Sequence, residues 1–103
     1  MTSELEAKLA SADRRFAKAS GKLERKVYGD STERLKVRIK GLDAAEASLV
    51  VAGREIASVT VAHGRAELDL ESAAGAVPPM RAGETVQVSV DEVVALEGTL
   101  VED

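Results

Sequence analysis

Strict alternation of apolar and charged residues over residues 33–40 limits most strongly what this chain can fold into. Leu35, Val37 and Ile39 alternate there with four cations, Arg34, Lys36, Arg38 and Lys40. Successive side chains of a strand point to opposite faces of its sheet, so the pattern predicts a half-buried strand with a cationic outer face. Residues 65–71 repeat the pattern with carboxylates in place of cations, and we expect these two strands to pair.

Four further segments have the composition of strands. Residues 47–52 and 55–62 are rich in valine and isoleucine, and residues 84–90 and 93–101 place apolar side chains at alternate positions. Short polar or glycine-containing steps separate neighbouring segments. They predict two-residue hairpin turns at Gly53-Arg54, His63-Gly64 and Asp91-Glu92.

Two periods fit the first quarter of the chain. Apolar residues at spacings of three and four predict a helix over residues 4–28; these are Leu5, Leu9, Ala12, Phe16, Ala19 and Leu23. Leu5, Ala7 and Leu9 also alternate, as do Ala19, Gly21 and Leu23, which predicts two strands joined by residues 11–15. The period alone leaves both alternatives open.

The spacing of glycine and proline residues resembles that of a group of small domains. Residues 64–70 read G-x-A-x-L-x-L, residues 77–88 read V-P-x-x-x-x-G-E-x-V-x-V, and residues 96–100 read L-x-G-x-L. With the segment that begins SGKLERKVYG at Ser20, this resembles small, uncharacterised bacterial β modules, a resemblance that implies an all-β fold. The closing segment is also similar to that of CHRD-type β domains, but it lacks their histidine-containing motif, so no functional residue carries over.

We therefore expect one all-β domain over residues 1–103, with an N-terminal segment 1–29 and a β core 33–102. The predicted architecture is an antiparallel sandwich or barrel of about seven to nine short strands. The alternative is an α+β fold, in which helix 4–28 covers a six-stranded antiparallel sheet. Hydrophobic residues make up 45% of the chain but include only two aromatics, Phe16 and Tyr28, so the core is expected to be aliphatic.

Residue types that support catalysis are scarce. The chain has no cysteine, and its one histidine, His63, lies at a predicted hairpin tip. Neither a phosphate-binding glycine loop nor a nucleophile elbow is present. We expect no catalytic residue, no metal site and no cofactor, hence no enzyme. Glu4 and Glu6 replace the basic start of a secretory signal, and the longest apolar run spans residues 49–52, so we expect a cytoplasmic protein without a membrane span.

Charge divides the chain in two. Residues 1–41 contain 11 Lys/Arg and 6 Asp/Glu, whereas residues 42–103 contain 3 Lys/Arg and 12 Asp/Glu. One interpretation is that the halves face each other as cross-strand ion pairs. The other is an interaction surface of one sign.

Two functions remain as hypotheses. The first is a non-catalytic β module that associates with itself as a homodimer or with another protein, for which residues 72–83 offer a partner loop containing Val77, Pro78, Pro79 and Met80. The alternative is binding of an anionic ligand on a basic face formed by Lys22, Lys26, Arg34, Lys36, Arg38 and Lys40. Nucleic acid is the less favoured anion, because no aromatic side chain lies among these cations to stack on a base.

Overall fold

The computed structural model describes residues 3–29, 32–73 and 80–102, and within them the protein is all-β, with no α-helix. Nine strands and one 3₁₀-helix follow one another along the chain. They are β1 (Ser3–Ser11), η1 (Arg14–Phe16), β2 (Ser20–Val27), β3 (Thr32–Lys40), β4 (Glu46–Val51), β5 (Arg54–Thr60), β6 (Ala66–Ala73), β7 (Thr85–Val90), β8 (Val93–Thr99) and β9 (Val101–Glu102).

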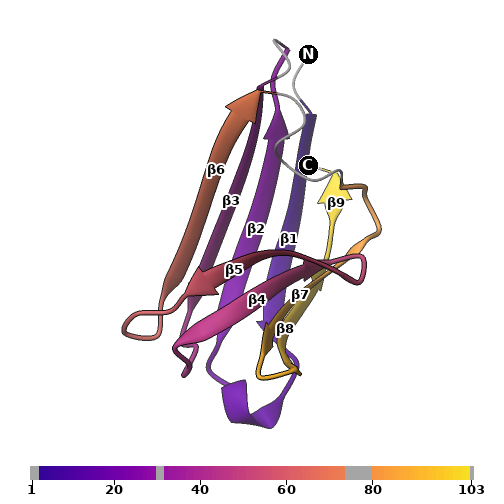
Figure 1. Ribbon diagram of the computed structural model, residues 1–103. Coiled ribbons are helices and arrows are strands. Elements are labelled where there is room, and N and C mark those ends of the chain that lie inside the picture. The colour runs from indigo at the N-terminus through magenta and orange to yellow at the C-terminus, as the bar shows by residue number, and fades with distance from the viewer. Residues whose placement is uncertain (1–2, 30–31, 74–79, 103) are drawn as a thin grey trace.

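All nine strands belong to one antiparallel sheet that curls into a nearly closed barrel. Its order is β5-β4-β7-β8-β1-β2-β3-β6, and β9 pairs with β1 beside β8. In Figure 1, β4 and β5 cross in front of β1, β2, β3 and β6, so the sheet folds over to form two layers. The curl stays open between β5 and β6: within the described residues these strands do not pair, and an isolated bridge joins Ala62 and Arg65 in the turn between them.

The N-terminal segment forms two strands, so the alternative with helix 4–28 is wrong. Ala7, which lies off the expected helical stripe, is fully buried, whereas Ala12, which lies on it, is exposed. β1 pairs antiparallel with β2, with Leu9 opposite Gly21. A Cβ on Gly21 would come within 2.8 Å of the Arg38 carbonyl oxygen, so glycine keeps β2 close to β3. Strands form here in place of a helix because a period of two buries every alternate side chain against the rest of the sheet.

The interior is aliphatic, as the composition predicts. Its fully buried large side chains come from both layers and are Leu23, Leu35, Val37, Leu42, Leu49, Val86, Val88, Leu96 and Leu100. Phe16 of η1 is buried at one end of the core, while Tyr28 is 36% exposed. Leu70, expected to point inward from β6, is 38% exposed because no further strand covers this edge of the sheet.

Two of the three predicted hairpin turns are confirmed. His63 and Gly64 have φ angles of 55° and 76°, and Asp91 and Glu92 have φ angles of 49° and 68°, as primed turns require. The first turn lies one residue earlier than predicted. Ala52 and Gly53 form it, with φ angles of 52° and 81°, and Arg54 instead opens β5 opposite Val51.

Candidate functional site

The predicted pairing of the cationic and acidic strands is present. β3 and β6 run antiparallel, with Arg34 opposite Glu71, Lys36 opposite Asp69 and Arg38 opposite Glu67. β2 lies on the other side of β3, so its outward side chains continue the same rows. The outer face of β1, β2, β3 and β6 therefore contains four columns of charged residues in register.

Cations gather at one end of this face. The register aligns Lys8, Lys22 and Arg38 in a row across β1, β2 and β3, with Glu67 of β6 at its end. Lys40 lies one row further along β3, opposite Ser20. This end of the outer face is therefore enriched in positive charge.

A concave site of about 530 Å³ opens at this end, and we call it the basic groove. Five cations and one carboxylate line it, and β2 contributes a glycine and a serine to its floor. Its lining residues are Lys8, Ser20, Gly21, Lys22, Arg38, Ile39, Lys40, Arg65 and Glu67. A volume of this size is in the range of small-molecule sites, which run from about 300 to 1,000 Å³.

Two of the five cations have carboxylate partners. Lys22 Nζ lies 3.2 Å from Glu24 Oε1 and 3.3 Å from Glu6 Oε1. Arg38 Nε lies 4.0 Å from Glu67 Oε1, at the limit of an ion pair. Among the described residues, no carboxylate lies within 4.0 Å of the charged nitrogens of Lys8, Lys40 or Arg65. Three of the five cations in the basic groove therefore form no ion pair with a described carboxylate, although Glu67 lines the same groove.

Ionisation of Lys22 is stabilised by its neighbours. Its hydrogen bonds to Glu24 and then to Glu6 raise the pKa of its ammonium group. In return, the hydrogen bond from Lys22 lowers the pKa of Glu24. Both groups are therefore charged at neutral pH, and the charge of Lys22 is shared with acids outside the groove.

At the opposite end of the face the cations are neutralised. Arg34 donates two hydrogen bonds to Asp69, at 2.9 and 3.2 Å, and Lys26 Nζ lies 3.8 Å from Glu4 Oε1. The hydrogen bonds between Arg34 and Asp69 raise the pKa of Arg34 and lower that of Asp69. The ion-pair interpretation of the charge division therefore describes this end of the face.

The six cations proposed from the sequence share one face, but only three of them, Lys22, Arg38 and Lys40, line the basic groove. Sequence reasoning missed Lys8 and Arg65. Lys8 has the outward parity between the buried Ala7 and Leu9, so the alternation of β1 contained the signal. Arg65 has the outward parity of Glu67 and Asp69 in the alternating segment 65–71, so that pattern contained the signal for Arg65 as well.

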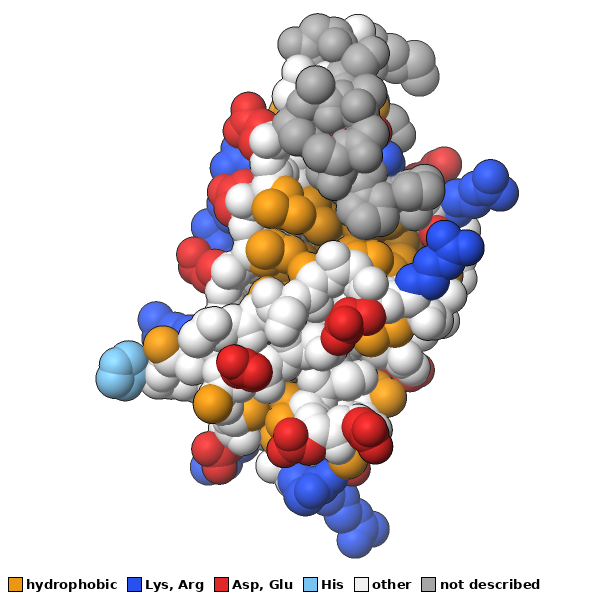
Figure 2. Space-filling model, viewed as in Figure 1, with side chains coloured by type: hydrophobic (Ala, Val, Ile, Leu, Met, Phe, Trp, Pro, Cys, Tyr) orange, Lys and Arg blue, Asp and Glu red, His pale blue; other side chains and the backbone are white. Residues whose placement is uncertain are grey.

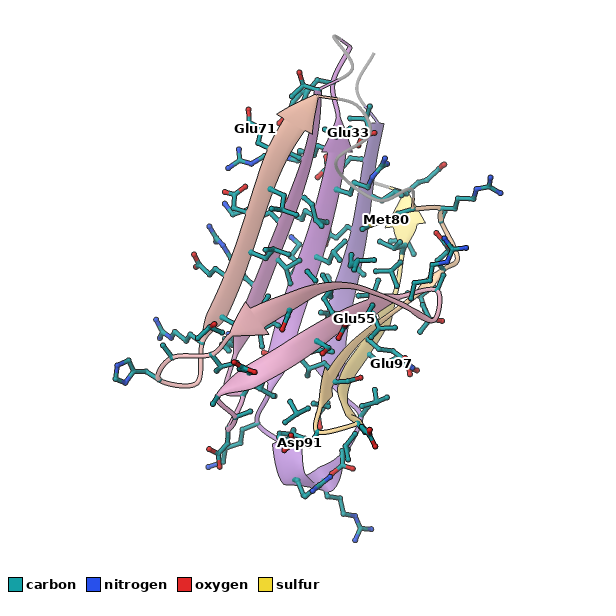
Figure 3. The ribbon with its side chains drawn as sticks, viewed as in Figure 1. Glu33, Glu55, Glu71, Met80, Asp91 and Glu97 are labelled. Carbon is teal, nitrogen blue, oxygen red and sulfur yellow. The ribbon has the colours of Figure 1, made fainter. Side chains whose placement is uncertain are left out.

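Of the four residues named for the expected partner loop, Met80 alone is described, and it does not support the prediction. Val77, Pro78 and Pro79 lie outside the described residues. Met80 was expected to be presented to a partner, but it is 6% exposed and belongs to the core cluster. Figure 3 shows Met80 close to the start of the segment that leads into β7. An apolar, flexible side chain gains more from filling the interior than from facing water.

The sequence analysis also missed an ion pair on the inward face. Arg25 of β2 donates from Nη2 to Glu33 Oε1 of β3 at 3.1 Å, and the two side chains are only 12% and 14% exposed. Both lie at inward positions: Arg25 is level with Leu35, and Glu33 lies opposite Val27. Glu33 is near the end of the sheet marked by Glu71 in Figure 3, far from the basic groove. This ion pair therefore lies on the inward face of the sheet and does not line the basic groove.

Metal-ligating side chains and the histidine are further candidates for chemistry beside the groove. Within the described residues, no three His, Asp or Glu side chains gather in a way that could hold a metal ion. His63 is exposed at its turn and does not line the basic groove. The described part of the chain contains no helix that could cross a membrane.

Comparison with models of protein families yields no match, and no curated protein matches this sequence significantly. The functional argument therefore depends on the geometry of the basic groove.

Proposed function

We propose that this protein is a non-catalytic β module that binds a compact, multiply charged anion in the basic groove. The observation that carries the proposal is the convergence of Lys8, Lys40 and Arg65, three cations without a carboxylate partner among the described residues, on one concave site. Like charges held close together repel one another. A bound anion relieves that repulsion.

The composition of the groove favours phosphate groups as the charged part of the ligand. Arg38 and Arg65 offer planar guanidinium groups that can bind two oxygens at once, and the lysines add mobile point charges. Ser20 has a short side chain and Gly21 has none, and both are half-exposed, so they leave room for an oxyanion beside the cations. Neither aromatic residue lines the groove, which supports recognition of charge rather than of a base.

Calorimetric titration of the intact protein with inorganic tripolyphosphate tests this proposal. At low ionic strength we expect saturable binding that weakens as salt is added, because exposed charges are screened beyond about 10 Å at 0.1 M salt. Lys40→Glu and Arg65→Glu should each weaken binding by about tenfold or more, equivalent to at least about 1.4 kcal/mol.

Arg54→Glu is the matched control. It makes the same change in net charge at an exposed site on β5, in the other layer of the fold. We expect this variant to bind almost as well as the wild type. Absence of binding at low salt, or equal weakening by all three substitutions, would overturn the proposal.

Self-association, the first hypothesis from the sequence, stays a prediction. The observation that bears on protein binding is the uncovered edge of β6.

A further inference from the structure

Among the described residues, no strand pairs with the outer edge of β6. β6 is the last strand in the sheet and pairs with β3 on one side only. Within the described residues its other side has no paired strand; the bridge to the β5 side, between Ala62 and Arg65, comes before β6 begins. Eight residues of strand present roughly 26 Å of edge, whose unpaired N–H and C=O groups can accept another strand. Figure 1 shows β6 at the rim of its layer.

Apolar surface lies on the inward side of this edge. Leu70 is 38% exposed and Leu68 is half-buried, although both have the inward parity of a core residue. Figure 2 shows hydrophobic side chains reaching the surface on this side of the molecule. An added strand would cover Leu70 as β3 covers the other side of β6.

The outward side of the edge is acidic. Glu67, Asp69 and Glu71 are all exposed and lie at alternate positions of β6. Arg34 pairs with Asp69, and Arg38 lies 4.0 Å from Glu67, both from the β3 side. Glu71 has no ion pair among the described residues. A strand on the open side would therefore face three carboxylates.

Charge argues against a second copy of β6 as that strand. Antiparallel pairing of β6 with itself would bring carboxylates directly opposite carboxylates, which is destabilising. β3 shows which strand fits β6: it places Leu35 and Val37 inward and three cations opposite the three acids. The suitable occupant has the same alternation of apolar and basic residues.

From this juxtaposition we infer that β6 binds an extended segment of a partner protein in which Lys or Arg alternates with Val, Ile or Leu. The segment extends the sheet through main-chain hydrogen bonds, its apolar side chains cover Leu70, and its cations pair with Glu67, Asp69 and Glu71. This interaction goes beyond the proposed anion binding and uses the opposite charge on a different strand.

A synthetic eight-residue peptide that alternates lysine with valine is the probe, used with the full chain. We expect saturable binding and slower amide hydrogen exchange in β6. Glu71→Lys should weaken binding by up to about fivefold, the effect of losing one cross-strand charge pair. Leu70→Lys should weaken it by about the same factor or more, because an inward charge blocks strand addition at an edge.

Glu55→Lys is the matched control, since Glu55 is an exposed acid on β5, the other edge of the sheet. Its binding should equal that of the wild type. Equal binding of a peptide that alternates glutamate with valine would overturn the inference, as would protection of β5 in place of β6. These outcomes are distinguishable from loss of tripolyphosphate binding, because Leu70 and Glu71, the two substituted residues, do not line the basic groove.

Discussion

Arg25 and Glu33 are charged residues at positions where their strands place side chains inward. Arg25 Nε and Glu33 Oε2 are buried and have no hydrogen-bond partner among the described residues, although the other nitrogen and oxygen of the pair meet at 3.1 Å. Desolvation of both groups is therefore incompletely compensated. Such a pair contributes little net stability, but removing one member leaves the other charge buried alone.

Single and double substitutions should show this asymmetry. We expect Arg25→Met alone or Glu33→Leu alone to lower the free energy of unfolding by about 1–3 kcal/mol. The double variant should recover most of that loss, because two apolar side chains suit the inward face. Urea denaturation of the three variants measures the effect. Additive losses in the double variant would show that the two side chains are not coupled.

Sequence parity could have found this pair, since Arg25 shares the parity of Leu23 and Glu33 that of Leu35. What the sequence could not show is that the two positions lie on adjacent strands. Leu70 is the reverse case: its parity predicts burial, but its exposure depends on β6 being the end of the sheet, which is a property of strand order.

At the scale of elements, the three hairpin turns differ in how well their residues suit the positive φ angles that they adopt. His63-Gly64 and Ala52-Gly53 each include a glycine at a positive φ, whereas Asp91-Glu92 has none. Glu92 adopts a φ of 68°, a conformation that strains a residue with a Cβ. The hairpin of β7 and β8 tolerates this because both strands are held in the sheet on both sides.

Replacing Glu92 by glycine should stabilise the protein. The Asp-Gly sequence favours this turn, and the relief of strain is expected to raise the free energy of unfolding by about 0.5–1 kcal/mol. Glu92→Ala is the control, because it removes the charge and keeps the Cβ. Thermal or urea unfolding of both variants provides the comparison. An equal gain in both would assign the effect to charge.

The ion pairs between strands make stability depend on acid. Asp69 has a pKa below its ordinary value of 3.8 because of Arg34, and Glu24 has a pKa below 4.5 because of Lys22. A carboxylate with a depressed pKa in the folded state stabilises the fold above its unfolded pKa, and this contribution is lost as the pH falls through the folded pKa.

We therefore expect the free energy of unfolding to fall as the pH is lowered below 4.5 for Glu24 and below 3.8 for Asp69, because there the unfolded chain binds protons more readily than the folded protein. Arg34→Met should flatten this dependence, since Asp69 then titrates nearer its ordinary pKa. Urea unfolding at pH 3, 4, 5 and 7 tests the expectation. An identical slope in the variant would mean that Asp69 gains nothing from Arg34.

The strands were largely predictable because each buries alternate side chains, a local pattern that the sequence contains directly. The first quarter of the chain was ambiguous for a physical reason: its many alanines fit either a helix or a narrow sheet interior. The burial of Ala7 distinguishes the strand from the helix, and it depends on the packing of β1 between β2 on one side and β8 and β9 on the other.

At the scale of the whole molecule, antiparallel pairing turns the division of charge along the sequence into a division across one face. Acids of β6 neutralise β3 at the end where Arg34 and Asp69 meet, and cations accumulate at the end where β1, β2 and β3 meet Arg65. The basic face was visible in the sequence. The groove was not visible in the sequence, because two of its cations, Lys8 and Arg65, are 57 positions apart along the chain.

Nuclear magnetic resonance titration of the ¹⁵N-labelled protein with tripolyphosphate is the most direct test of this account. The amide shifts should concentrate at residues 8, 20–22, 38–40 and 65, and leave residues 26 and 34 of the same face nearly unchanged. Shifts spread evenly over all lysines and arginines, or centred on residues 26 and 34, would contradict the claim that the strand register gathers free cations in one groove.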